Sequence, residues 1–374
     1  MLLSYRYRIE PNRTQTALLS EMLGDFCQLY NAALEHRIRA YEKGVSIRVN
    51  EQMASLPIIR RDLPHIGRWS ATAEQQVMRR LDKAFQAFFG RVKRDRTPGF
   101  PRFKSRDRYH AADFRVGDGM TVRKSGKLGF VGIPGEIKVH WHRNLPSKPK
   151  SCILSRNAGK WYIIFHVEVA HVDRAGPDSI GIDLGLTNFV ALSNGKTVDR
   201  PNFTKKNARK LRRLQRALSR CKRDSKVRGK RKLAVARHQA HIANSRRDFL
   251  HKESRKIVNC FGRIAVEDLN IKGLARGMLA KSVHDASWGQ FVQMIRYKAE
   301  SAGCEFVEVD PRGTSQTCPE CGTVAKKTLA ERHHRCDCGC SLDRDVAAAM
   351  VVHQRAFGFP PGAGGGSSSW SVAA

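Results

Sequence analysis

The chain has 374 residues, of which 41% are hydrophobic, and this length allows two or three domains with cores of their own. Lysine and arginine total 68 against 34 acidic residues, so the net charge of +34 at pH 7 indicates a polyanionic partner such as nucleic acid. No apolar run approaches the ~18 residues of a membrane-spanning helix, and the first residues lack the apolar core of a signal peptide, so we expect a cytoplasmic protein with no membrane partner.

The N-terminal stretch predicts a strand followed by a long helix. Apolar and polar residues alternate from Leu3 to Ile9, which is typical of a half-buried strand. Asn12 and Gln15 fit a capping box, and apolar residues then recur at helical spacing up to Gly44.

A second helix is expected over residues 70–93, with a basic outer face. The following residues 97–110 combine proline, aromatic and basic residues. This composition suits a loop on a phosphate backbone with Phe100, Phe103 or Tyr109 near bases, and it fits a plain linker equally well.

Short apolar stretches then follow one another between Phe114 and Val169, separated by turns that contain glycine or proline. They predict a small β-barrel that the N-terminal strand closes, with the first helical region inserted between its strands. Pro177 marks the boundary to the next domain.

An apolar hairpin carries the first candidate site residue. Ile180 and Ile182 alternate before Asp183, and the apolar run 189–192 follows, with Asn194-Gly195 as the turn to a further strand. A carboxylate in an apolar strand is costly unless it is paired or binds a cation, so Asp183 is a candidate metal ligand. The alternative is a plain aspartate at a strand end.

The next segment is the most basic part of the chain, with 21 Lys or Arg against three acids between Lys205 and Lys256. Its apolar spacing is helical and is interrupted once, which predicts two helices linked by a basic turn. Such a run is often only a solvated face. Here the charges are nearly all positive, and we expect contact with nucleic acid phosphates.

A second apolar strand, Ile264–Val266, also ends in a carboxylate, Glu267. The order of strand hairpin, helix, strand, helix and strand is that of an α/β domain with carboxylates at strand ends, as in ribonuclease-H-like nucleases. A third carboxylate would come from Asp343 or Asp345, just before a helical stretch. Three such groups can hold two Mg²⁺ ions about 4 Å apart for phosphodiester hydrolysis.

Two closely spaced cysteine groups interrupt that domain, Cys318 with Cys321 and Cys336 with Cys338 and Cys340. This spacing predicts a four-thiolate structural Zn²⁺ site, with a redox pair as the alternative. Cys340 could replace Cys338 as the fourth ligand. His333 and His334 are further possible ligands.

At this point the residues resemble a known family. The segments GIDLGLTNFVAL, IAVEDLNIKGL, SVHDASWGQFVQMIRYKAESAG, DPRGTSQTCPECG and CSLDRDVAAAM look, in this order, like the TnpB family of transposon-encoded nucleases, relatives of the type V CRISPR effectors. The N-terminal segments YRYRIEPNRTQ, LYNAALEHR and PRFKS resemble the same family, so the resemblance covers nearly everything except the tail.

The resemblance implies an α/β and β multidomain fold. A wedge β-barrel with an inserted helical recognition domain would be followed by an RNase-H-like RuvC nuclease domain, which a zinc ribbon that binds the target nucleic acid interrupts. The implied ranges are 1–10 and 105–177 for the barrel, 11–104 for the recognition domain, 178–317 and 341–357 for the RuvC domain, 318–340 for the zinc-binding insertion, and 358–374 for a flexible tail.

The resemblance also implies the site residues. The catalytic and Mg²⁺-binding carboxylates of the three RuvC motifs fall on Asp183, Glu267 and Asp345; Ala347 stands where the family usually has Asn, which keeps Asp343 as an alternative. Cys336-x-Cys338 is one residue shorter than the family's common spacing, but Cys338-Gly339 aligns. The implied Zn²⁺ ligands are Cys318, Cys321, Cys336 and Cys338.

The implied function is an RNA-guided, Mg²⁺-dependent DNA endonuclease. Its guide would be an RNA made from the transposon end, and a monomer with one RNA would cut complementary double-stranded DNA next to a short adjacent motif. Alternatives are a catalytically silent RNA-guided DNA-binding regulator, a compact type V CRISPR effector, and a transposase that joins DNA strands itself.

Overall fold

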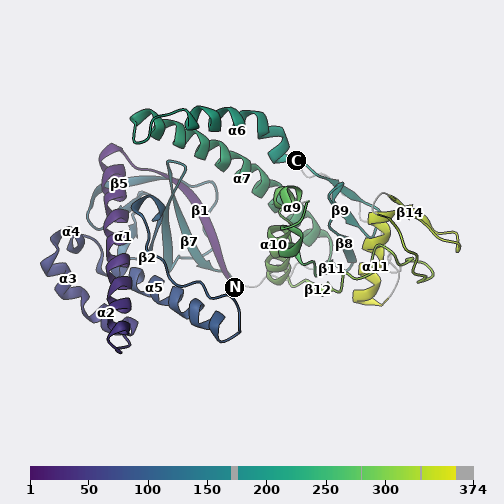
Figure 1. Cartoon of the computed structure of the whole chain (residues 1–374), viewed down its shortest axis with the longest axis horizontal. Coiled ribbons are helices and arrows are strands. Elements are labelled where there is room, and N and C mark those ends of the chain that lie inside the picture. Colours follow the sequence, from purple (N-terminus) through teal and green to yellow (C-terminus); the bar gives the residue numbers. More distant parts are fainter. Residues whose placement is uncertain (170–175, 279, 329–330, 359–374) are drawn as a thin grey trace. The chain divides into compact units, whose positions relative to one another are not determined.

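The computed structural model describes residues 1–169, 176–278, 280–328 and 331–358, which belong to two compact units, 1–169 and 170–374 (Figure 1). The predicted tail, residues 358–374, lies outside the described residues apart from Gly358.

Seven strands close a β-barrel in the first unit, in the order β1, β5, β4, β3, β2, β6, β7. They are β1 (Leu2–Glu10), β2 (Ala111–Val116), β3 (Gly119–Val122), β4 (Leu128–Phe130), β5 (Ile133–His140), β6 (Ser151–Asn157) and β7 (Lys160–Glu168). The N-terminal strand completes the barrel because β1 pairs antiparallel with both β5 and β7. Its alternation buries Tyr7 and Ile9 in the apolar core. The predicted barrel is therefore confirmed.

The chain between β1 and β2 is helical, as the sequence predicts. It forms α1 (Arg13–Glu42), α2 (Val49–Ala54), α3 (Leu56–Asp62), α4 (Pro64–Gly67) and α5 (Ala71–Val92), with a short 3₁₀ turn at Arg106–Arg108. Asn12 and Gln15 form the predicted capping box, each side chain accepting a hydrogen bond from the other's backbone N–H at 2.8 and 3.0 Å. The sequence does not predict α2, α3 and α4, which are too short to show a helical apolar period.

The second unit is built on a five-stranded mixed sheet in the order β10, β9, β8, β11, β12. The strands are β8 (Ser179–Asp183), β9 (Asn188–Leu192), β10 (Thr197–Asp199), β11 (Arg263–Glu267) and β12 (Glu305–Val309). β8, β11 and β12 run parallel, whereas β9 and β10 run antiparallel to their neighbours. The carboxyl ends of β8 and β11 therefore lie side by side.

Helices cover both faces of this sheet. The helices of the unit are α6 (Phe203–Ser219), α7 (Lys226–Cys260), α8 (Ile271–Leu274), α9 (Ala280–Ala286), α10 (Trp288–Ala302) and α11 (Arg344–Phe357). Phe189, Ile257 and Phe291 belong to the core between the sheet and helices α7 and α10. On the other face, Val352 of α11 packs against Ala265. A hairpin of β13 (His333–Arg335) and β14 (Ser341–Asp343) carries the second cysteine group and leads into α11.

A glycine in β8 allows α11 to approach the sheet closely. Ile180 and Ile182 face the α10 side, and Gly181 between them faces α11. A Cβ at Gly181 would lie 2.2 Å from the carbonyl oxygen of Ala349, closer than atoms can approach.

We expect Gly181→Ala to push α11 off β8 and to lower the free energy of unfolding by about 1–3 kcal/mol, as overpacking does. Thermal unfolding of the full chain measures this. The control is Gly229→Ala in α7, where a Cβ would meet nothing within 4 Å. Equal melting temperatures for Gly181→Ala and the wild type would show that α11 does not need this contact.

Candidate functional site

Three acidic side chains from distant parts of the sequence meet at one edge of the sheet. Asp183 is the last residue of β8 and Glu267 the last residue of β11; the register pairs Ile182 with Val266, so the two carboxylates lie on neighbouring strand ends. Asp345 lies in the first turn of α11, and a Cβ at Gly185, two residues after Asp183, would be 3.3 Å from its Oδ2. The structure thus brings Asp183, Glu267 and Asp345 together.

The electrostatics of this cluster are unfavourable when all three groups are ionised. Burial, together with the charges of Glu267 and Asp345, raises the pKa of Asp183 well above its ordinary value of 3.8. Burial also raises the pKa of Glu267, although hydrogen bonding to Thr314 and the charge of Arg355 partly offset this. Carboxylate oxygens are the ligands that Mg²⁺ prefers, so the donors present fit such an ion, whose charge would relieve the repulsion.

Two residues that sequence analysis did not single out shape the cluster. Thr314 donates a hydrogen bond through Oγ1 to Oε1 of Glu267 at 2.5 Å. Arg344 forms an ion pair with Asp345, with 3.3 Å between Nη2 and Oδ1. No sequence signal marks Thr314, because its nearness to Glu267 follows only from the fold.

The structure separates the roles of Asp343 and Asp345. Asp343 is the N-cap of α11, where its Oδ1 accepts hydrogen bonds from the backbone N–H groups of Asp345 and Val346 at 2.9 and 3.3 Å. Its carboxylate is therefore turned toward the helix end. Asp345 is the residue whose charge acts on Asp183.

The predicted cysteine ligands also come together. Ligand atoms of Cys318, Cys321, Cys336 and Cys338 all lie within 4.8 Å of one another. The Sγ atoms of Cys318 and Cys338 are 3.7 Å apart, and those of Cys321 and Cys336 are 3.5 Å apart. Hydrogen bonds, first of all to Thr323, lower the pKa of the Cys321 thiol to about 6. This cluster could hold a zinc ion.

Cys340, His334 and His333 are the further candidate ligands from the sequence. Cys340 and His334 are 3% and 1% exposed, and with Cys318 they form a second group within 4.8 Å. His333 lies in neither group, and its Nε2 is 3.0 Å from Oγ of Ser341. Among the described residues, both groups that meet this distance are in the cysteine module, so the three carboxylates are more widely spaced than the thiols.

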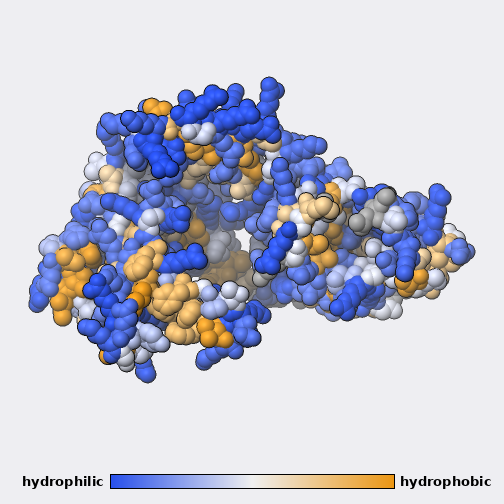
Figure 2. Space-filling view, in the orientation of Figure 1, coloured by the Kyte–Doolittle hydropathy of each residue, from blue (hydrophilic) through white to orange (hydrophobic). Residues whose placement is uncertain are grey.

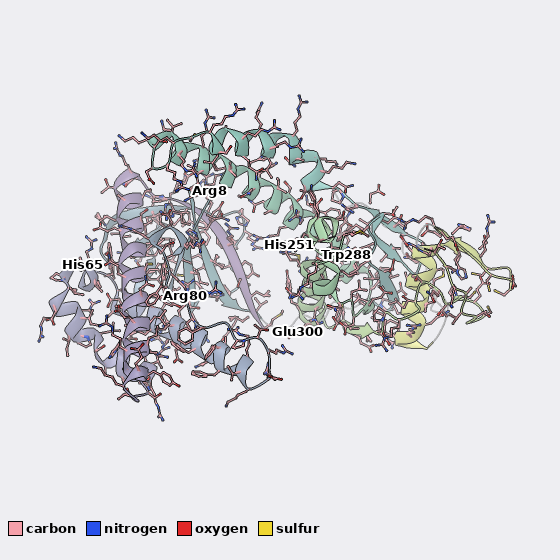
Figure 3. All side chains as sticks on the ribbon, in the orientation of Figure 1. Arg8, His65, Arg80, His251, Trp288 and Glu300 are labelled. Atoms are coloured by element: carbon pink, nitrogen blue, oxygen red, sulfur yellow. The ribbon has the colours of Figure 1, made fainter. Side chains whose placement is uncertain are left out.

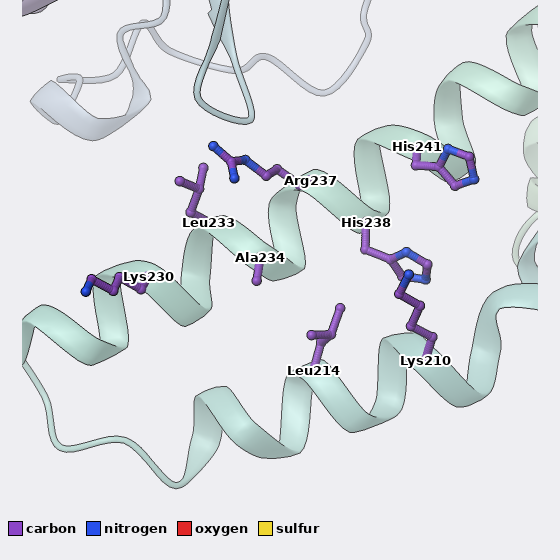
Figure 4. Close-up of a pocket in the computed structure, with 8 residues that line it drawn as sticks. All are labelled: Lys210, Leu214, Lys230, Leu233, Ala234, Arg237, His238 and His241. Atoms are coloured by element: carbon purple, nitrogen blue, oxygen red, sulfur yellow. The ribbon is translucent and has the colours of Figure 1, made fainter. Parts of the chain in front are cut away.

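Basic side chains line two grooves. In the first unit, Arg79, Arg80 and Lys83 of α5 border a hollow of about 430 Å³ against the barrel, and Arg80 donates to the carbonyl of Ala111 at 2.8 Å (Figure 3). In the second unit, α6 and α7 form the predicted basic helix pair, with a groove of about 590 Å³ between them (Figure 4). The basic side chains of both hollows suit a polyanion.

The three aromatic residues of the segment 97–110 differ in exposure. Phe100 and Phe103 are 47% and 57% exposed, whereas Tyr109 is 1% exposed. Tyr109 packs beneath Arg80 and Lys104, so the expectation that it lies near bases is wrong. No helix in the described ranges is long and apolar enough to cross a membrane.

Comparison with known proteins identifies the family. Residues 163–278 match the family described as "Probable transposase", and residues 288–352 match "Cas12f1-like, TNB domain". A protein of Streptomyces pristinaespiralis named "Putative RNA-guided DNA endonuclease" is 34% identical over 360 residues, covering 93% of this chain and 88% of that protein. The chain belongs to the TnpB family.

A second relative also supports the family, and two solved structures share the fold. "Putative RNA-guided DNA endonuclease InsQ" of Escherichia coli is 28% identical over 358 residues, covering 90% of this chain and 87% of that protein. The fold resembles the protein in a Cas12f1–sgRNA–target DNA complex, with a TM-score of 0.59 at 14% identity over 90% of this chain and 82% of that one. It also resembles the mini-RNA-guided endonuclease CRISPR-Cas_phi3, with a TM-score of 0.51 at 9% identity over 96% of this chain and 93% of that one.

One further family match has a description that does not fit the structure. Residues 1–45 match a family described as "Helix-turn-helix domain", but here they form the strand β1 and the single helix α1. In this TnpB chain the segment therefore contributes to the barrel and its inserted helices.

Replacing Asp183 by Asn should stabilise the fold. Because the pKa of Asp183 in the folded chain lies above its ordinary value of 3.8, its ionisation costs folding free energy once the pH exceeds that raised pKa. We expect Asp183→Asn to raise the melting temperature at pH 8 in Mg²⁺-free buffer, by roughly 2–4 °C per kcal/mol of repulsion removed. The gain should shrink toward pH 4, where the folded chain already carries the protonated acid.

Thermal scans at several pH values measure this effect. Asp199→Asn, at an exposed position of the same sheet, is the matched control and should change little. If Asp183→Asn has a lower melting temperature than the wild type at pH 8, the ionised Asp183 carboxylate is stabilised by its neighbours and not repelled by them.

Proposed function

We propose that this chain is a transposon-encoded RNA-guided DNA endonuclease that cuts double-stranded DNA complementary to its guide RNA, next to a short adjacent motif. The observation that carries the proposal is the meeting of Asp183, Glu267 and Asp345 at the edge of the mixed sheet in a chain of the TnpB family. The net charge of +34 and the two basic grooves support nucleic acid as the partner.

The proposed chemistry is phosphodiester hydrolysis with two Mg²⁺ ions. Asp183, Glu267 and Asp345 would hold the ions, because carboxylate oxygens are the ligands that Mg²⁺ prefers. When bound, the ions supply an activated water and stabilise the leaving oxygen. Thr314 holds Glu267 in one orientation by its hydrogen bond, and Arg344 forms an ion pair with Asp345.

The proposed domain ranges and their roles follow those of the TnpB family. Residues 1–10 and 105–177 would form the wedge barrel, 11–104 the recognition domain, and 178–317 with 341–357 an RNase-H-like RuvC domain. The insertion 318–340 would bind a structural Zn²⁺ through Cys318, Cys321, Cys336 and Cys338, and contact target nucleic acid. A silent regulator is not favoured, because all three acids are present and close together.

The proposal predicts the effect of removing single carboxylates. With guide RNA and Mg²⁺, Asp183→Ala, Glu267→Ala and Asp345→Ala should each lower the rate of target cleavage at least about a hundredfold, as loss of transition-state stabilisation does. Binding of matched DNA should persist in all three variants. Cleavage assays and binding assays on the same preparations measure both.

Asp343→Ser is the matched control, because serine also caps a helix. It should keep most of the cleavage rate, since Asp343 holds the end of α11 and not the ions. Loss of cleavage in Asp343→Ser with an intact melting temperature would assign the third carboxylate to Asp343. A wild-type complex that binds matched DNA and leaves it whole would establish the regulator instead.

The zinc proposal is tested by metal content. Cys338→Ala should lose zinc, because it removes one of four thiolates that lie together. Cys340→Ala should keep one zinc per chain. Elemental analysis of purified full-length protein distinguishes the two, and retention of zinc in Cys338→Ala but not in Cys340→Ala would make Cys340 the ligand.

A further inference from the structure

The groove between α6 and α7 has the features of a binding site in its own right. The two helices lie side by side, joined by the turn at residues 220–225, and no residue of α6 is buried. Asp285 fixes the start of α6, because its carboxylate accepts hydrogen bonds from the backbone N–H of Thr204 at 3.1 Å and from Nη2 of Arg246 at 2.8 Å. Helices α6 and α7 therefore form the two sides of the groove, and the start of α6 is held in place.

Positive charge surrounds the groove. Lys210, Lys230 and Arg237 line it, and no acidic residue does (Figure 4). No acidic side chain in the described part of the chain forms an ion pair with any of the three. Cations gathered around one hollow repel one another, and an anionic occupant removes that repulsion.

A buried histidine points to a ligand independently of the charge. His238 is 7% exposed, and its Nε2 atom is buried without a hydrogen-bond partner. Figure 4 shows Lys210 reaching from α6 toward this ring across the groove. A buried polar atom that lacks a partner destabilises the folded chain. A ligand in the groove would supply the missing partner.

Apolar side chains also line the groove. Leu214, Leu233 and Ala234 are among its lining residues, and Figure 2 shows apolar side chains between the hydrophilic surfaces of the two helices. The rings of His238 and His241 lie 6.3 Å apart with their planes inclined by only 23°. A simple anion would use the cations alone. A nucleotide uses both parts, since bases stack on imidazole and apolar surfaces while phosphates contact Lys and Arg.

We propose that this groove binds one unpaired nucleotide of a nucleic acid strand, its base against Leu214 and His238 and the phosphates that flank it on Lys210, Lys230 and Arg237. The volume of about 590 Å³ is within the range of roughly 300–1,000 Å³ found for small-ligand sites. The inference rests on the proposed function, because it presupposes a nucleic acid partner. The strand is either the guide RNA or the target DNA.

Matched charge changes test the phosphate contacts. The double variant Lys210→Gln with Arg237→Gln is compared with Arg231→Gln with Arg247→Gln, which removes the same charge from exposed positions outside the groove. We expect the groove variant to bind the strand that occupies the groove at least about tenfold more weakly than the control variant, with the salt dependence of log K reduced by roughly 0.7 per lost contact. Equal affinities of the two variants for both guide RNA and target DNA would overturn the proposal.

His238→Leu tests the base contact, because leucine keeps the bulk and removes the ring nitrogens. It should weaken binding without changing the salt slope, and a guide RNA containing 4-thiouridine should crosslink to peptides of α6 or α7 in the wild type and less in this variant. The same label is placed in the target strand of an assembled complex, and crosslinks confined to other parts of the chain with both strands would contradict the proposed site. Melting temperatures of all variants identify those that fail to fold, and Lys230→Gln then replaces the affected variant.

Two binding assays distinguish guide RNA from target DNA as the bound strand, and the groove inference from the proposed function. Binding of guide RNA by the protein alone is compared with binding of target DNA by the assembled complex, and the defect appears in the arm whose strand occupies the groove. If wild-type protein binds no discrete RNA, the proposed function fails. If it binds RNA and cuts DNA while the groove and control variants behave alike in both arms, only the groove inference fails.

Discussion

The repulsion among three carboxylates held at one edge of a sheet is the constraint on which the rest of the second unit depends. Ionised acids at such close quarters favour separation or protonation, and burial adds to the penalty. The fold opposes this by fixing each acid through a different element: Asp183 at the end of β8, Glu267 at the end of β11 and Asp345 in the first turn of α11. Packing elsewhere in the unit thus offsets the repulsion within the cluster.

The packing that resists the repulsion is visible between β8 and α11. A glycine between two buried isoleucines lets the helix lie close to the strand, and the helix buries Val351 and Val352 in return. Arg344 and Thr314 then reduce the charge penalty locally, one by an ion pair and one by a hydrogen bond. A divalent cation bound between such carboxylates would relieve their repulsion. Its binding would therefore stabilise the folded chain, which links stability to metal affinity.

Much of this fold follows from the sequence, because its signals are local. The alternation of Ile180 and Ile182 before Asp183 predicts a strand that ends in a carboxylate, and the cysteine spacing predicts the thiol cluster. The residue pattern left Asp343 and Asp345 open and the resemblance chose Asp345; the cap geometry shows that Asp343 is the one that turns toward the helix N–H groups. Thr314 and the burial of Tyr109 were out of reach for a different reason. Their contacts join residues far apart in sequence, and no periodicity encodes such contacts.

The cysteine module and the acidic cluster are joined more closely than their separate motifs suggest. The segment that enters the module carries Thr314, which holds Glu267, only four residues before Cys318. The segment that leaves it carries Asp343, which caps α11 and so sets the first turn where Asp345 lies. Gln354 of α11 also donates through Nε2 to the carbonyl of Pro319 at 2.5 Å. Both connections and this hydrogen bond therefore tie the cysteine module to Glu267 and to the helix that carries Asp345.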